Sequence, residues 1–111
     1  MKKPARGAKK PAVKRGNRAH QQDDILMELI GERIVVDLRS EYVCLGTLAR
    51  VDEHSLGLKD ADIHDLRDTD TGRENYVAAS IATGIKRNRK NVVIMRSDVA
   101  AVAKLADVVD T

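Results

Sequence analysis

Apolar and polar residues alternate along several short stretches of the chain, a pattern typical of strands with one buried face. The clearest case is Arg33–Leu38, in which Ile34, Val36 and Leu38 share one side. Gly46 interrupts a longer stretch of the same kind, and a glycine inside a strand marks a sharp bend or a close backbone approach. The pattern predicts strands at residues 33–38, 42–51, 55–60, 92–96 and 99–103. We therefore expect a mainly β fold, a small and strongly bent five-stranded antiparallel barrel.

A short helix is predicted before the first strand, in residues 22–30. Ile25 and Leu29 are four residues apart, as are Leu26 and Ile30, so each pair falls on one side of a helix. A helix of this length is not stable alone in water. We expect its apolar side to pack over an open end of the barrel.

A second helix is predicted between the third and fourth strands. Residues 61–75 are rich in charge and poor in apolar residues, so their first part is expected to be a loop. Thr71, with Glu74 three positions later, has the form of a capping box. The helix should begin there, continue through Thr83 and end at Gly84.

Composition limits the class of protein. The chain has no Phe or Trp and two Tyr, so Ile, Leu, Val and Ala must form the core. A single cysteine, Cys44, excludes an intramolecular disulfide, and we expect it to be a small buried apolar residue. No apolar run approaches the ~18 residues of a membrane span, and no apolar segment follows the basic N-terminus as in a secretory signal. We expect a cytoplasmic protein without membrane contact.

Charge is distributed unevenly along the 111 residues. Residues 1–19 contain eight lysines and arginines and no acidic residue, which leaves 12 basic against 17 acidic residues, a net charge of −5, in residues 20–111. The basic segment has too few apolar residues to fold alone, so we predict a disordered arm followed by one domain at 20–111. Such an arm either contacts nucleic-acid phosphates or is a solvated leader.

The order of these elements, together with specific residues, resembles the Sm and Sm-like family, which includes bacterial Hfq. The resemblance covers about residues 22–104. Within the family, the chain is similar to the prokaryotic type, which has a helical insert between its two motifs. Positions that match the first motif are Gly31, Val36, Leu38, Gly46, Leu48, Asp52, Leu56, Leu58 and Asp60, and those of the second are Ile94, Arg96, Val99 and Val102. The resemblance implies an SH3-like barrel with an N-terminal helix. It also implies homo-oligomeric rings of six or seven copies, paired through the fourth and fifth strands.

The resemblance also implies an RNA-binding pocket beside the pore of the ring. In the family a base stacks on a residue of the loop after the second strand, and an Arg-Gly pair completes the pocket. By position the loop is 52–55, His54 is the stacking residue and Arg96 is the arginine. The family's Asn is absent, with Ser55 its nearest polar substitute beside Asp52, and Ser97 stands in place of the glycine. His54 could instead cap the hairpin, and Arg96 could pair with Asp52 or Asp98.

A dense basic cluster precedes the fourth strand and is a second candidate for RNA contact. Its members are Lys86, Arg87, Arg89 and Lys90, which we call the basic cluster. Copies of it around a ring would form a collar for the RNA backbone. The alternative is a solvated connector between helix and strand.

Catalytic and metal-binding patterns are missing from the sequence. There is no nucleophile elbow, phosphate loop or zinc spacing, and the acidic residues around His64 do not match a calcium loop. We therefore predict a ring-forming RNA-binding protein that is not an enzyme and has no cofactor. The alternatives are an oligomeric protein-interaction scaffold with little specific RNA binding, or DNA binding through residues 1–19.

Overall fold

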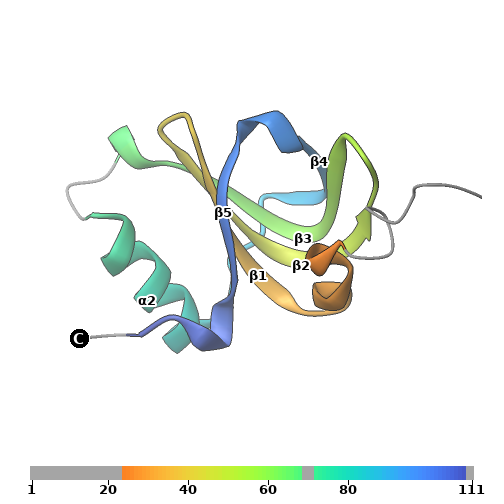
Figure 1. Cartoon of the computed structure of the whole chain (residues 1–111). Coiled ribbons are helices and arrows are strands. Elements are labelled where there is room, and N and C mark those ends of the chain that lie inside the picture. The colour runs from red at the N-terminus through yellow and green to blue at the C-terminus, as the bar shows by residue number, and fades with distance from the viewer. Residues whose placement is uncertain (1–23, 69–71, 110–111) are drawn as a thin grey trace, which may run out of the picture.

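The structure is a computed structural model that describes residues 24–68 and 72–109. The predicted arm at 1–19 and the predicted capping residue Thr71 lie outside these residues. The elements are the 3-10 helix η1 (Ile25–Leu29), strands β1 (Arg33–Leu38), β2 (Tyr42–Val51) and β3 (Ser55–Asp65), η2 (Leu66–Asp68), helix α2 (Arg73–Thr83), β4 (Arg89–Met95), η3 (Arg96–Asp98), β5 (Val99–Lys104) and η4 (Leu105–Asp107) (Figure 1).

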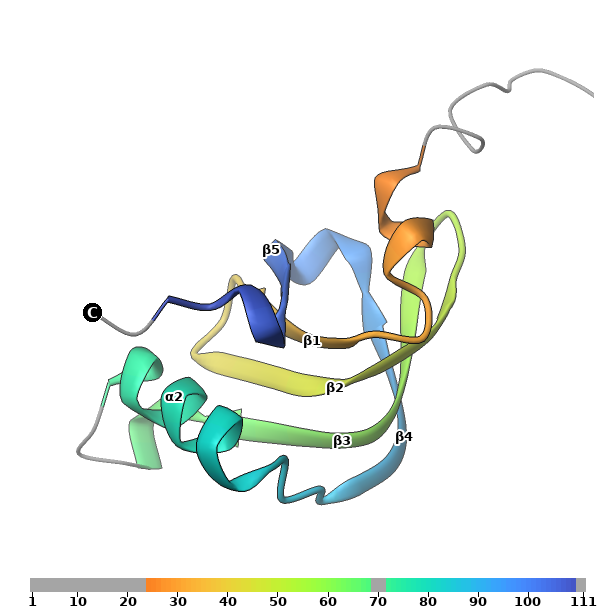
Figure 2. The same ribbon diagram turned by 90° about the horizontal axis from the view of Figure 1, so that it is seen from below.

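The strands form one antiparallel sheet of five strands in the order β4-β3-β2-β1-β5. The sheet curls strongly from β4 round to β5 (Figure 2). No pairing joins β4 to β5 in the described part of the chain, so the sheet is bent but unclosed. The predicted bent five-stranded fold, with a helix before β1 and another between β3 and β4, is confirmed.

Alternation along the strands supplies two hydrophobic clusters, one on each side of the sheet. On β1, Ile34 and Val36 enter the first cluster, while Val35 enters the second. The first cluster lies inside the curl, where Leu26 and Leu29 of η1 pack against it. The second cluster lies under α2 and η4 and has the members Val35, Val43, Leu45, Val77 and Leu105.

The sheet bends where β2 and β3 approach closely. Thr47 pairs with Lys59 and Leu45 pairs with Asp62, so two residues of β3, Asp60 and Ala61, lie opposite Gly46 alone. This is a β-bulge, and Asp60 has a φ of 50° there. A Cβ atom on Gly46 would lie 3.0 Å from the Cβ of Ala61 and 3.2 Å from its Cα.

The prediction that a loop begins at residue 61 is wrong, because β3 bends at the bulge and continues to Asp65. Asp62 and His64 are polar strand residues that contact α2 in place of solvent. The His64 ring stacks on Tyr76 at 3.9 Å between centroids, and the Tyr76 hydroxyl donates a hydrogen bond to Asp62. Within residues 24–68 and 72–109, no group of three His, Cys, Asp or Glu residues is arranged to hold a metal ion.

The helices differ in detail from the prediction. The segment before β1 is a 3-10 helix with three residues per turn, so the positions that share a side are three apart. Leu26 and Leu29 therefore pack on the core, whereas Ile25 and Ile30, which we had paired with them, are exposed. Helix α2 begins after Gly72 without a side-chain cap and ends at Gly84 as predicted.

Strand β4 begins at Arg89 and not at Val92, because Arg89 pairs with Ala61. Cys44 is fully buried as predicted, and burial raises the pKa of its thiol to about 12. None of the helices described here is long and apolar enough to cross a membrane.

Candidate nucleic-acid interface

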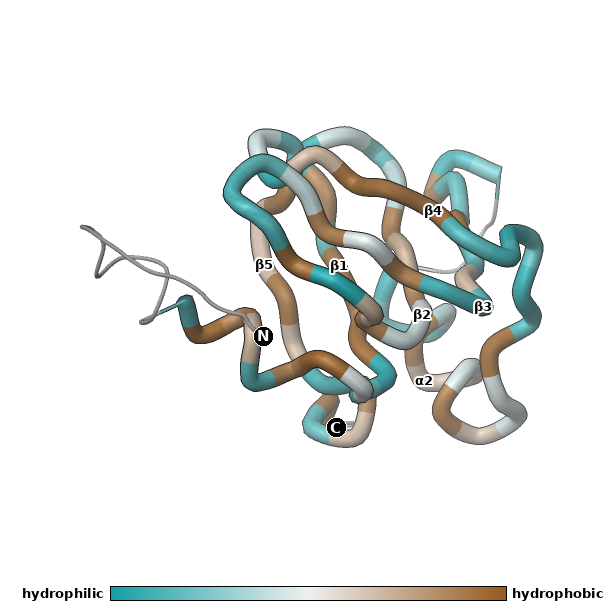
Figure 3. The backbone as a smooth tube through the Cα atoms, turned by 90° about the vertical axis from the view of Figure 1, so that its right-hand side faces the viewer, coloured by the Kyte–Doolittle hydropathy of each residue, from teal (hydrophilic) through white to brown (hydrophobic). Residues whose placement is uncertain are grey.

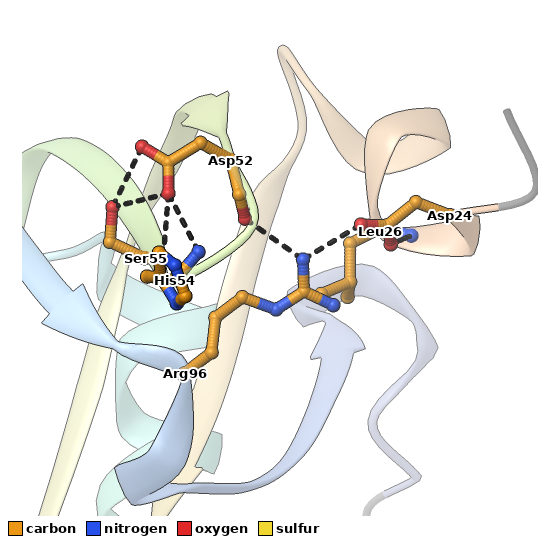
Figure 4. Close-up of polar contacts among 6 residues, drawn as sticks. All are labelled: Asp24, Leu26, Asp52, His54, Ser55 and Arg96. Carbon is orange, nitrogen blue, oxygen red and sulfur yellow. Dashed lines mark hydrogen bonds and ion pairs between the residues drawn. The ribbon is translucent and has the colours of Figure 1, made fainter. Parts of the chain in front are cut away.

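Two connections far apart in sequence meet at one end of the sheet: the β2–β3 loop and the turn η3 between β4 and β5. The backbone N–H of Arg96 donates to the carbonyl of His54 at 2.9 Å, which joins the two connections directly. Pairing of Ser55 with Met95 at the start of the β3–β4 ladder holds them in register. The fold thus brings together Asp52, His54, Ser55 and Arg96, the four residues predicted for the pocket (Figure 4).

Asp52 organises the loop through its carboxylate. Its Oδ1 accepts hydrogen bonds from the backbone N–H groups of His54 (2.9 Å) and Ser55 (2.8 Å). Both carboxylate oxygens lie within hydrogen-bond distance of the Ser55 hydroxyl, at 3.0 and 3.1 Å. These bonds, that of the His54 N–H first, lower the pKa of Asp52 because they favour its ionised form. Asp52 and Ser55 therefore shape the loop, and their polar atoms are largely engaged with each other.

His54 lies at the tip of this loop with its side chain 80% exposed. Its Nε2 is 3.9 Å from an Oε1 oxygen of Glu53, a loose contact between two exposed groups. The backbone of His54 is fixed on both sides, by Asp52 and by Arg96, while the ring projects into solvent. Such a ring can stack on a planar ligand.

Arg96 is held by two acceptors. Its Nη1 donates to the Asp24 carboxylate at 2.7 Å and to the Asp52 carbonyl at 3.0 Å (Figure 4). The hydrogen bond from Arg96 is the main reason that the pKa of Asp24 lies below its usual value. With 30% of its side chain exposed, Arg96 still reaches the surface beside His54. The predicted alternative of an ion pair to Asp52 or Asp98 is replaced by a pair with Asp24.

Sequence reasoning missed Asp24 as a member of this site. It is the N-cap of η1, where its Oδ1 accepts from the Leu26 N–H at 3.1 Å. Asp24 and Arg96 are 72 positions apart, so no local sequence pattern links them. The only signal in the sequence is that Asp24 stands where a helix N-cap is expected. Asp24 is the first residue that the structure describes, and its bond to Arg96 places it at the His54 end of the sheet.

The basic cluster lies elsewhere. On the β3–β4 ladder Ser55 pairs with Met95, whereas Ala61 pairs with Arg89 at the opposite end. Six residues of strand correspond to ~20 Å. The four basic side chains are exposed, and Arg87 forms an ion pair with Asp60 at 2.5 Å. Within one chain the cluster therefore does not join His54 and Arg96.

No family model matches the sequence, and no curated protein matches it. The Sm protein of Pyrococcus abyssii, solved in complex with a uridine heptamer, is 18% identical with a TM-score of 0.50, over 73% of this chain and 93% of that chain. A heptameric archaeal Sm protein is 20% identical with a TM-score of 0.45, over 71% and 93%. The P. aerophilum SmAP1 heptamer is 20% identical with a TM-score of 0.46, over 71% and 85%.

The similarity to the first of these structures identifies the fold of this chain as Sm-like. At this level of identity the similarity establishes the fold, and the role of each side chain has to be argued from the site itself.

Proposed function

We propose that this chain assembles into a ring and binds RNA without catalysis, with a base stacked on His54. The observation that carries the proposal is the junction of the β2–β3 loop and η3, which presents an exposed imidazole next to a positioned guanidinium. A solved structure of the same fold was obtained in complex with a uridine heptamer, which supports RNA as the ligand class.

The open edges of the sheet support assembly. Strands β4 and β5 each leave one row of backbone N–H and C=O groups unpaired by other strands of the described chain, and such edges recruit partners. Val93 and Met95 of β4 are exposed, and a groove of about 410 Å³ lies along this edge between Leu38 and Ile94. In Figure 3 the backbone tube has the hydrophobic colour over the later part of β4 and along much of β5, whereas the first three residues of β4 are hydrophilic. Pairing β4 of one copy with β5 of the next is heterologous and closes into a ring when the rotation permits.

The distribution of charge indicates that the basic arm, residues 1–19, binds the RNA phosphates. Asp24, Asp52 and Glu53 surround His54 and Arg96, so the site alone has little attraction for phosphate. Residues 1–19 carry eight positive charges and precede Asp24 in the sequence by only a few residues. The arm supplies the phosphate contacts near His54. The basic cluster, repeated around the ring, holds the RNA backbone at the other end of the β3–β4 ladder.

Binding of a fluorescent RNA heptamer, measured by anisotropy at low and high salt, tests the proposal. We expect affinity that falls steeply with salt, because phosphate contacts release counterions. His54→Ala should weaken binding by about 5- to 150-fold, the range expected for loss of one stacked base. Asn75→Ala, at an exposed position in α2, is the matched control and should bind as the wild type does. Absence of binding at low salt would refute the proposal.

Arm-led DNA binding is the second candidate, favoured by the net charge of −5 in residues 20–111. Deleting residues 1–19 separates the two. If the deletion removes all binding and DNA competes equally with RNA of the same sequence, the arm alone is responsible. If residual RNA binding persists and remains sensitive to His54→Ala, the barrel contributes its own site.

A further inference from the structure

The hydrogen-bonding groups around His54 are mostly used within the loop. Both oxygens of the Asp52 carboxylate accept internal bonds, and the Ser55 hydroxyl donates to them. The carbonyls of Asp52 and His54 accept from Arg96, and the Ser55 carbonyl accepts from the Asp52 N–H. These groups fix the loop and leave little to read the edge of a base.

Glu53 is the exception. Its side chain is 68% exposed, and its carboxylate has no hydrogen-bond partner among the residues that the structure describes. It lies on the loop tip next to the ring of His54, with 3.9 Å between Oε1 and Nε2. A base stacked on that ring would therefore present its edge close to a free carboxylate.

A carboxylate at neutral pH only accepts hydrogen bonds. Adenine, cytosine and guanine each carry an amino group on the pairing edge, and cytosine N4 donating to Glu or Asp is a known mode of base recognition. Uracil has two carbonyl oxygens flanking one N–H on that edge, so a carboxylate that approaches this N–H also faces the partial negative charge of an oxygen on either side. We infer that Glu53 makes this loop select bases with an amino group over uracil. This inference rests on the proposed function, in which a base stacks on His54.

Binding of rC6 and rU6 is the decisive comparison. Both oligomers carry the same number of phosphates, so the electrostatic contribution cancels, and both bases are pyrimidines with similar stacking surface. We expect wild-type protein to bind rC6 about tenfold more tightly than rU6, within the range for one good base contact. Glu53→Gln replaces the carboxylate with an amide that both donates and accepts, so the rC6 to rU6 ratio should fall toward one.

Removing a negative charge strengthens binding of any RNA, so the ratio and not the affinity is the readout. Glu28→Gln makes the same change of charge at an exposed position of η1 and should leave the ratio at its wild-type value. The inference is overturned if wild type binds rU6 as tightly as rC6 or more tightly, or if Glu53→Gln leaves the rC6 to rU6 ratio unchanged. In either case the proposed function still stands if binding depends on His54. Failure of both oligomers to bind at low salt overturns both.

Discussion

The pair Asp24–Arg96 anchors the segment before β1 to the turn after β4. Asp24 also caps η1, so two substitutions separate the two roles. Asp24→Asn keeps a good cap and an acceptor but loses the charge, and should lower the free energy of unfolding by about 1 kcal/mol. Asp24→Ala loses the cap as well and should cost about 2 kcal/mol. Urea unfolding measures both, and Asp98→Asn is a charge-matched control for which we expect no comparable loss.

The same pair makes stability depend on pH. The pKa of Asp24 is lowered in the folded protein, so its contribution is present above its unfolded value of about 4 and is lost as the pH falls through the folded value. The difference in unfolding free energy between wild type and Asp24→Asn should therefore be largest near pH 7 and shrink below about pH 4. Urea unfolding at pH 7 and pH 3 tests this, and a constant difference would exclude the charge as its source.

At the scale of elements, the bend of the sheet depends on Gly46. A methyl group there meets both the side chain and the backbone of Ala61, and backbone cannot move aside easily. We expect Gly46→Ala to destabilise the fold by about 1–3 kcal/mol, the usual cost of overpacking. Gly57→Ala is the control, because its nearest neighbour would be the Arg50 side chain at 3.4 Å. Equal effects of the two variants in thermal unfolding would contradict a special role for Gly46.

The elements also show what local sequence can and cannot reveal. The bounds of β1 and β2 were predicted correctly because apolar residues dominate both stretches and a polar turn separates them. The far end of β3 was missed because Asp62 and His64 face Tyr76 of α2, so polar residues occupy a covered side. The β2–β3 loop and Arg96 came from resemblance to a family pattern. Asp24 had no such pattern, since its bond to Arg96 forms only when segments 72 positions apart meet.

At the scale of the whole molecule, the unpaired edges predict an oligomer. Wild type should elute in light-scattering chromatography at six or seven times the 12.2 kDa chain mass. Val93→Lys places a charge on the β4 edge, where the wild-type side chain is 57% exposed, and should give monomers that remain folded. Ile81→Lys, at a 44% exposed position on α2, is the control and should keep the ring. A wild-type protein of single-chain mass at micromolar concentration would refute the assembly.

We expect assembly in turn to determine affinity for RNA, because each chain contributes one exposed imidazole and one partly neutralised arginine. A single base and a few arm phosphates give weak binding, whereas linked sites in a ring act on one RNA with a high effective concentration. Val93→Lys should therefore reduce affinity for a heptamer by about 10²-fold or more, although it leaves His54 and Arg96 themselves unchanged. A mononucleotide should bind the wild type and the variant equally, since it occupies one site. If the variant is monomeric and yet keeps wild-type affinity for the heptamer, then RNA contacts a single chain, and the ring has a different purpose.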